Sequence, residues 1–193
     1  VTKMDDVLLQ HNFVHVIEND RQDAVAVTQI LEHVFSELSI KGIKRVYLRS
    51  DNAPSYHASS VLTSLPGIST RTGVEVAEYN FSESQNGKSA AYRVAGAVKN
   101  KVRSFVDSGK DAKNHAEFFL AATSGRLLEA TSFYLASVQG GTTSKNKIAR
   151  VSEMYDFRFE TTGVRAWRHR EIGEGLFSPT SLSSTMEMEV HSG

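Results

Sequence analysis

The sequence contains no cysteine, and this absence excludes several kinds of chemistry. A chain without cysteine has no disulfide bridge, no thiolate zinc site and no cysteine nucleophile. It also lacks any apolar run that approaches the roughly 20 residues needed to span a bilayer. We therefore expect a protein that makes no membrane contact and works in a reducing compartment, the nucleus or the cytoplasm.

The sequence has no net charge either, since 22 Lys and Arg residues balance 22 Asp and Glu residues. Any attraction to nucleic acid must then come from a local patch, because no field from the whole chain supplies it. The 193 residues are enough for an ordinary globular core. The chain opens on Val1 and not on Met, which indicates a piece of a longer polypeptide.

Hydrophobic periodicity predicts strands and helices that alternate along the chain, the pattern of an α/β fold. Apolar residues that recur every two positions, or in short β-branched runs, predict strands over 13–17, 45–49 and 74–81. Spacings of three and four predict helices over 22–38, 57–62, 94–105 and 112–124. Pro66 and Gly67 predict a loop that ends the second of these helices.

Composition predicts three regions along the chain. Residues 1–139 form the α/β core, and residues 140–177 form an extension whose short aromatic strands pack on that core. Residues 178–193 are rich in Ser and Thr with little hydrophobic periodicity. We expect this last region to be loosely ordered or held by a partner.

Two polar segments carry a resemblance to a known group of proteins. The first is RSDNAPSYH at 49–57, and the second is YNFSESQNGK at 79–88, which runs into Arg93 on the following helix. In order and setting they resemble the ribonuclease H-like core of DDE transposases and retroviral-type integrases, and in particular a group of transposon-derived animal proteins. The likeness extends over residues 13–111, with weaker similarity at 164–168 and 172–175.

The resemblance implies a mixed sheet flanked by helices, whose first strand lies upstream of Val1. In such enzymes three carboxylates hold two Mg²⁺ or Mn²⁺ ions about 3.5–4 Å apart for phosphodiester transfer. The first acid would lie upstream of this chain. The second matches Asp51, and the third position, on the helix after the second polar segment, is occupied by Tyr92.

Tyr92 decides the functional prediction. A phenol with an ordinary pKa of about 10 is neutral at pH 7 and is a poor ligand for a hard metal ion. Glu78 and Glu83 precede the helix, so we expect neither to replace the missing acid. The sequence thus predicts a catalytically degenerate domain without a metal or other cofactor, Asp51 being a vestigial ligand.

Such a domain is expected to serve in the nucleus as a scaffold for self-association or a partner protein, with DNA contact as a further use. The alternative is an active DDE transposase or nuclease that requires Mg²⁺ or Mn²⁺. A third possibility is a nuclease-like domain that uses Asp51 and one other acid. Fold-level resemblance does not choose among these.

Other polar residues carry weaker signals, each beside a structural alternative. A helix without acids predicts contact with a phosphate backbone, unless it is simply a solvated face; its basic residues are Lys88, Arg93, Lys99, Lys101 and Arg103. Asp51 is also typical of a turn. Trp167 lies among three arginines and is interpreted first as a core residue. His15 and His57 lack a second histidine at ligand spacing, which favours structural roles.

Overall fold

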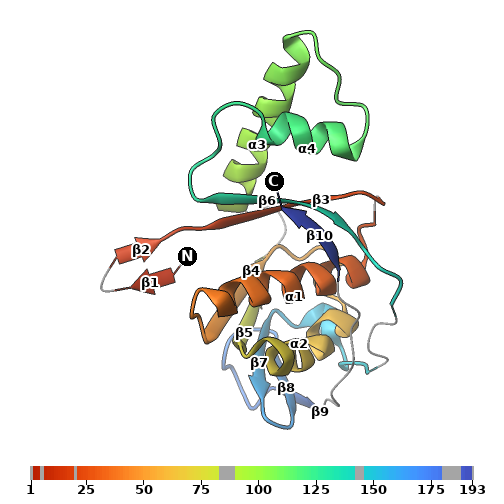
Figure 1. Ribbon diagram of the computed structural model, residues 1–193. Helices are drawn as coiled ribbons and strands as arrows, with labels where there is room; N and C mark the ends of the chain where they lie inside the picture. The colour runs from red at the N-terminus through yellow and green to blue at the C-terminus, as the bar shows by residue number, and fades with distance from the viewer. Residues whose placement is uncertain are drawn as a thin grey trace. The chain divides into compact units, whose positions relative to one another are not determined.

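The structure is a computed structural model that describes residues 2–4, 7–19, 21–82, 90–141, 146–179 and 188–192 (Figure 1). It divides into two compact units, and each is assembled from separate stretches of the chain. Unit 1 contains residues 1–21, 88–138 and 189–193. Unit 2 contains residues 22–87 and 139–188. The boundaries predicted after residues 139 and 177 stay a prediction.

Unit 2 is built on a five-stranded mixed sheet with the order β4-β5-β7-β8-β9. The strands are β4 (Arg45–Ser50), β5 (Glu75–Phe81), β7 (Asp156–Glu160), β8 (Gly163–Trp167) and β9 (Leu176–Pro179). β4 and β5 are parallel, and the remaining pairs are antiparallel. The short strands predicted after residue 148 are therefore present, and they extend the sheet sideways from β5.

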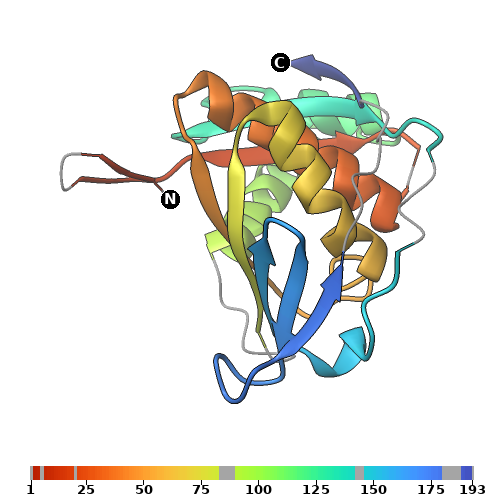
Figure 2. The ribbon, with the colours of Figure 1, turned by 90° about the horizontal axis from the view of Figure 1, so that it is seen from below.

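Two helices, α1 (Ala24–Ile40) and α2 (Ser59–Thr72), pack against each other and against one face of this sheet (Figure 2). Asp23 caps α1 by accepting hydrogen bonds from the amides of Val25 and Ala26, as a helix N-terminus requires. A short 3₁₀ turn, Val151–Glu153, precedes β7. The buried core joins both helices to the strands through Phe35, Leu62, Leu65, Ile68, Val74, Val76, Tyr79, Phe81, Ile148, Met154, Phe157, Val164 and Ala166.

The interruption predicted at Pro66 and Gly67 is wrong, because α2 continues through both residues to Thr72. A proline inside a helix removes one backbone hydrogen bond and costs about 3 kcal/mol. The side chains on either side offset this cost, since Leu65 and Ile68 are fully buried in the core. Tertiary packing thus overrides the local signal of the proline.

Unit 1 is built on a three-stranded mixed sheet with the order β10-β6-β3. β3 (Asn12–Ile17) runs parallel to β6 (Thr131–Ser137), and β10 (Glu189–Ser192) runs antiparallel to β6. Part of the terminal region is thus ordered as a strand, whereas its composition predicted loosely ordered or partner-held chain. β1 (Thr2–Met4) and β2 (Val7–Leu9) form a separate antiparallel pair.

The helices α3 (Ala90–Asp107) and α4 (His115–Thr123) cover one face of the unit 1 sheet (Figure 1). Their buried core is small and contains Val98, Ala122 and Phe133. Taken by class, the fold is mixed α/β, with two mixed sheets flanked by helices, which confirms the α/β prediction. Among the described helices, none is both long and apolar enough to cross a bilayer.

Candidate functional site

Asp51 follows β4 directly and begins a turn that runs to His57 in unit 2. Its Oδ1 accepts a hydrogen bond from the Ala53 amide at 3.3 Å, as in an Asx-turn. The Ser50 carbonyl accepts the Ser82 amide at 2.9 Å and the Ser82 hydroxyl at 3.2 Å. The ends of β4 and β5 are thus tied together where the polar turn begins.

Hydroxyl groups line the base of this turn. The Tyr79 hydroxyl donates to Ser50 Oγ at 3.1 Å, and Ser50 Oγ donates to the Asp51 carbonyl at 2.8 Å. Burial raises the pKa of Tyr79 to about 12, and the nearby Asp51 carboxylate contributes in the same direction. The pKa of Tyr56 is raised by the same two causes. The Asp51 carboxylate therefore lies near two phenol groups, those of Tyr56 and Tyr79, which stay neutral at pH 7.

Tyr92, at the position expected for the third acid, lies near the start of α3 in unit 1 and is 57% exposed. Asp51 belongs to unit 2, so the structure defines the surroundings of each residue within its own unit. No three His, Asp or Glu side chains gather as metal ligands in the described ranges. We assign no metal-dependent step to these described residues.

Of the two glutamates that precede the helix, the structure describes Glu78. Glu78 forms ion pairs with Arg170 at 2.9 Å and with Arg158 at 3.6 Å. Its carboxylate is thus engaged by two guanidinium groups on the surface of unit 2. Glu83 lies outside the described residues.

The basic residues of α3 separate into two groups. Arg93, Lys99 and Arg103 are exposed, and no ion pair joins them to an acid among the described residues. Lys101 instead donates to the carbonyls of Ser124 at 2.7 Å and Arg126 at 2.6 Å, where it satisfies backbone acceptors after α4. Sequence periodicity gave no sign of this capping role. Lys88 lies outside the described residues.

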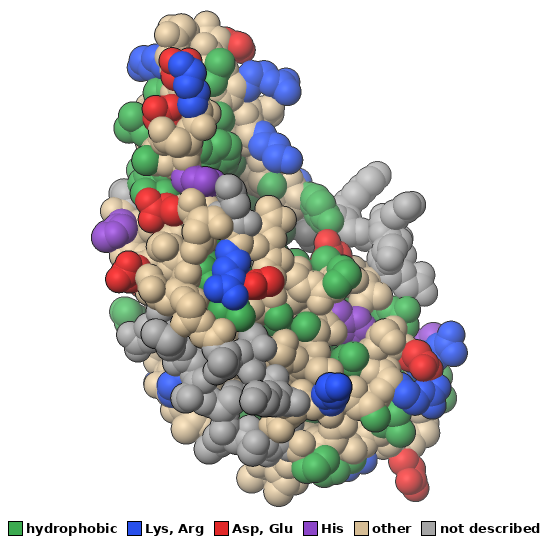
Figure 3. All heavy atoms as spheres, turned by 90° about the vertical axis from the view of Figure 1, so that its right-hand side faces the viewer, with side chains coloured by type: hydrophobic (Ala, Val, Ile, Leu, Met, Phe, Trp, Pro, Cys, Tyr) green, Lys and Arg blue, Asp and Glu red, His purple; other side chains and the backbone are tan. Residues whose placement is uncertain are grey.

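A shallow hollow of about 640 Å³ lies between α3 and the end of α4 in unit 1. Its lining includes Lys101, Lys110 and Ser104, and it contains no acidic residue. The Lys110 ammonium sits 4.9 Å from the centre of the Phe105 ring. Figure 3 shows basic and acidic side chains intermixed in the part of the surface drawn for α3 and α4, so neighbouring acids offset part of the positive charge there.

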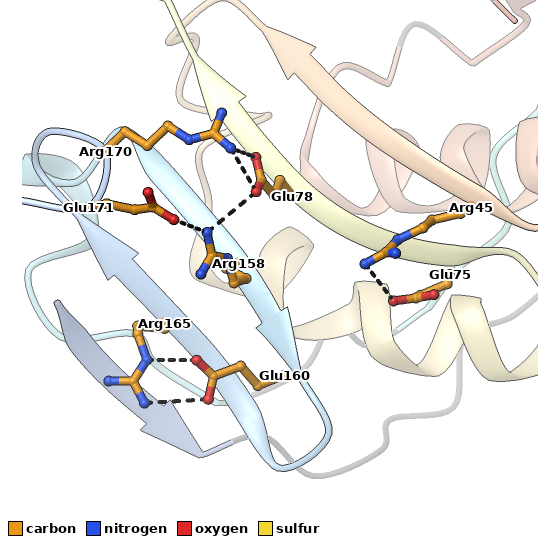
Figure 4. Close-up of polar contacts among 8 residues, drawn as sticks. All are labelled: Arg45, Glu75, Glu78, Arg158, Glu160, Arg165, Arg170 and Glu171. Carbon is orange, nitrogen blue, oxygen red and sulfur yellow. Dashed lines mark hydrogen bonds and ion pairs between the residues drawn. The ribbon is translucent and has the colours of Figure 1, made fainter. Parts of the chain in front are cut away.

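The face of the unit 2 sheet opposite its helices carries a network of ion pairs (Figure 4). Arg158 pairs with Glu78 and Glu171, and its guanidinium lies 5.4 Å from the Trp167 ring. Arg165 pairs with Glu160 at 2.6 Å. Neighbouring acids thus offset the positive charge of these arginines.

Trp167 is a core residue, as the structural interpretation predicted. It is 7% exposed, and its Nε1 donates to the Gly173 carbonyl at 3.1 Å. Beyond it, three large apolar side chains remain at the surface: Ile172 is 75% exposed, Phe177 is 42% exposed and Leu176 is 36% exposed. These three exposed side chains, named the apolar surface below, include two consecutive residues of the edge strand β9, Leu176 and Phe177, which point to opposite faces of the sheet.

The comparison with protein families places the chain in one of them. A family model described as "Domain of unknown function (DUF8701)" matches residues 1–163. The chain belongs to the DUF8701 family. The matched span contains Asp51 and Tyr92 and ends at the start of β8, so the apolar surface lies beyond it. No curated protein and no solved structure matches the chain.

Proposed function

We propose that this DUF8701 chain is a catalytically degenerate, ribonuclease H-like domain of transposase or integrase descent, which acts in the nucleus as a protein-interaction or dimerisation scaffold. Two features support this proposal: the parallel pair β4 and β5 joined by α2, and Asp51 directly after β4. The observation that carries the loss of catalysis is Tyr92, a phenol where a third acid is expected.

The scaffold role rests on the apolar surface of unit 2. Large apolar side chains at the surface are available for contact with another protein, and among the described strands β9 pairs with β8 alone. The arginines and glutamates beside this surface form ion pairs with one another. A polar rim around an apolar centre is the usual anatomy of a protein interface.

The scaffold role is tested by placing a charge on this surface. We expect Ile172→Asp combined with Phe177→Ser to abolish self-association in sedimentation equilibrium, or capture of a partner that the unaltered protein retains. The control is Ile40→Asp, because Ile40 is 81% exposed in the same unit but lies at the end of α1. Equal association of all three proteins would contradict the use of this surface.

Loss of catalysis is tested on the longer protein that contains this chain. Strand-transfer and nicking assays with Mg²⁺ or Mn²⁺ are expected to show no activity above a metal-free control. Activity that disappears in Asp51→Ala would overturn the proposal and establish the active DDE enzyme instead. Activity that persists in this variant would also overturn it and point to other carboxylates.

DNA binding through α3 is a second candidate, favoured by the exposure of Arg93, Lys99 and Arg103. Changing all three to Ala is expected to weaken duplex binding and to reduce the slope of log K against log salt by about 0.9 for each phosphate that is no longer neutralised. A matched control changes Lys41, Lys44 and Lys147, which are exposed on unit 2. No duplex binding by the unaltered protein at low salt would discard this candidate.

A further inference from the structure

His57, the last residue of the Asp51–His57 turn, is enclosed by aromatic rings in unit 2. Its ring centre lies 4.3 Å from that of Phe81, 5.6 Å from that of Phe157 and 6.3 Å from that of Tyr155. The Phe157 ring meets it edge-on. Only 8% of the residue is exposed. An imidazole in these surroundings has little access to water.

The hydrogen bonding of His57 defines which nitrogen carries the proton. The ring makes a hydrogen bond to the backbone of Met154, whereas Nε2 is buried and has no partner among the described residues. Nδ1 is therefore the donor to the Met154 carbonyl, and Nε2 keeps its lone pair. A proton added at Nε2 would bring a charge and an N–H group without an acceptor into the core.

The surroundings of His57 offer no charge to stabilise its cation. Burial lowers the pKa of His57 below its ordinary value of 6.5, and the hydrogen bond to Met154 opposes this change only in part. The elements packed on the ring contribute Phe81 from β5, Phe157 from β7 and Tyr155. No charged side chain contributes to this shift in the pKa of His57.

The turn depends on the seating of His57. The amides of Tyr56 and His57 both donate to the Ala53 carbonyl at 3.0 Å, and the Ala53 amide donates to Asp51. A His57 ring that leaves the aromatic enclosure would pull these hydrogen bonds apart. The Ala53 residue that these amides contact is also the one whose own amide donates to Asp51.

We propose that His57 is a proton-sensitive latch, whose protonation releases the Asp51–His57 turn from the core of unit 2 under mildly acidic conditions. The latch does not require the scaffold role or the descent from a transposase. In the closed form the neutral imidazole fills the aromatic enclosure. In the open form the imidazolium reaches water and the turn that carries Asp51 is free to move.

Hydrogen exchange of the amides at positions 56 and 57 tests the latch in the full chain. After correction for the intrinsic pH dependence of exchange, we expect the opening equilibrium to rise by up to about tenfold per pH unit as the pH falls from 6.5 toward the pKa of folded His57. His57→Phe keeps an aromatic ring but no titration, so its protection should not change with pH. His33→Gln is the matched control, since burial also lowers the pKa of His33.

A second measurement needs no substitution. NMR of the ring nitrogens in the unaltered protein should show a proton on Nδ1 of His57 and a titration midpoint below 6.5. A midpoint at or above 6.5 would overturn the latch. Exchange at positions 56 and 57 that follows pH equally in the unaltered protein and in His57→Phe would overturn it as well.

Discussion

The two units of this chain use their helices in opposite ways. In unit 2, α2 has 14 residues and buries seven of them, among them Leu62, Leu65 and Ile68. In unit 1, α3 has 18 residues, and Val98 is the one that is buried. Burial of apolar surface is the main source of stability, so α2 holds its unit together while α3 mostly presents its side chains to solvent. We expect substitutions at the buried positions of α2 to affect stability and those at the exposed positions of α3 to affect binding.

The polar contacts differ between the units in the same direction. Unit 2 buries Glu32 with both carboxylate oxygens on Arg71, at 2.5 and 3.0 Å, which ties α1 to α2. The buried amide of Gln29 donates to the carbonyl of Gln139 and accepts its amide, both at 3.1 Å. In unit 1, the comparable contact is made by the Lys101 ammonium, which donates hydrogen bonds to two backbone carbonyls at the surface. Buried polar groups with partners are costly to disturb, and exposed ones much less.

The largest difference in stability is expected when a leucine is shortened to alanine in the core of each unit. Leu65→Ala removes a fully buried side chain from α2 and should cost about 4 kcal/mol in the free energy of unfolding. Leu128→Ala removes a partly buried side chain that packs on the core of unit 1, and should cost about 2 kcal/mol. Urea unfolding of both variants measures the two losses. Similar losses would show that the small core of unit 1 is as sensitive to the loss of a side chain as the core of unit 2.

A somewhat smaller effect is expected when an ion pair loses its arginine. Arg71→Ala leaves Glu32 buried without a partner and should cost about 3 kcal/mol, the low end for a buried pair because Arg71 is one-third exposed. Arg45→Ala breaks an exposed pair with Glu75 and should cost less than about 1 kcal/mol. If the two variants unfold at the same urea concentration, the burial of Glu32 does not make its ion pair more stabilising than the exposed one.

The next effect concerns unit 1, where two lysines on one helix differ in use. Lys101→Met removes the donor to the carbonyls of Ser124 and Arg126 and should cost about 2 kcal/mol. Lys99→Met, two residues away on an exposed position, should leave the urea midpoint almost unchanged and instead weaken any DNA binding. A reversal, with Lys99 important for stability and Lys101 for binding, would contradict the two roles.

The strands β3, β4 and β5 and the helix α1 were predictable because their apolar spacing is strong. The run over 45–49 and the alternation over 74–81 correspond to β4 and β5, within one or two residues. The sequence did not reveal β10, since Glu189–Ser192 is mostly polar and forms a strand only by pairing with β6. The sequence also overestimated the helix-breaking effect of Pro66. Packing against distant parts of the chain outweighs the local cost of the proline.

For the candidate site, sequence placed Asp51 correctly at the end of a strand but not its neighbours. Tyr79 lies 28 residues further along and reaches Ser50 only because β4 and β5 pair in parallel. Lys101 appeared as one of several cations on a basic helix, since its carbonyl partners belong to the segment after α4. Contacts made through pairing and packing depend on distant residues, and periodicity reports only on the segment that carries it.

The smallest difference in stability is expected when one tyrosine hydroxyl is removed from each unit. Tyr79→Phe removes the hydroxyl that donates to Ser50 Oγ, and because Tyr79 is 2% exposed, water does not replace this bond, so the loss should be about 1 kcal/mol. Tyr92→Phe removes a hydroxyl from a side chain that is 57% exposed, and the change should stay below about 0.5 kcal/mol. Urea midpoints at pH 7.5 measure both. Since Ser50 directly precedes the Asp51–His57 turn, Tyr79→Phe should also lower the hydrogen-exchange protection of the amide at position 53, while Tyr92→Phe leaves it unchanged. A larger loss for Tyr92→Phe would mean that α3 contributes to stability through its exposed face and not only through Val98.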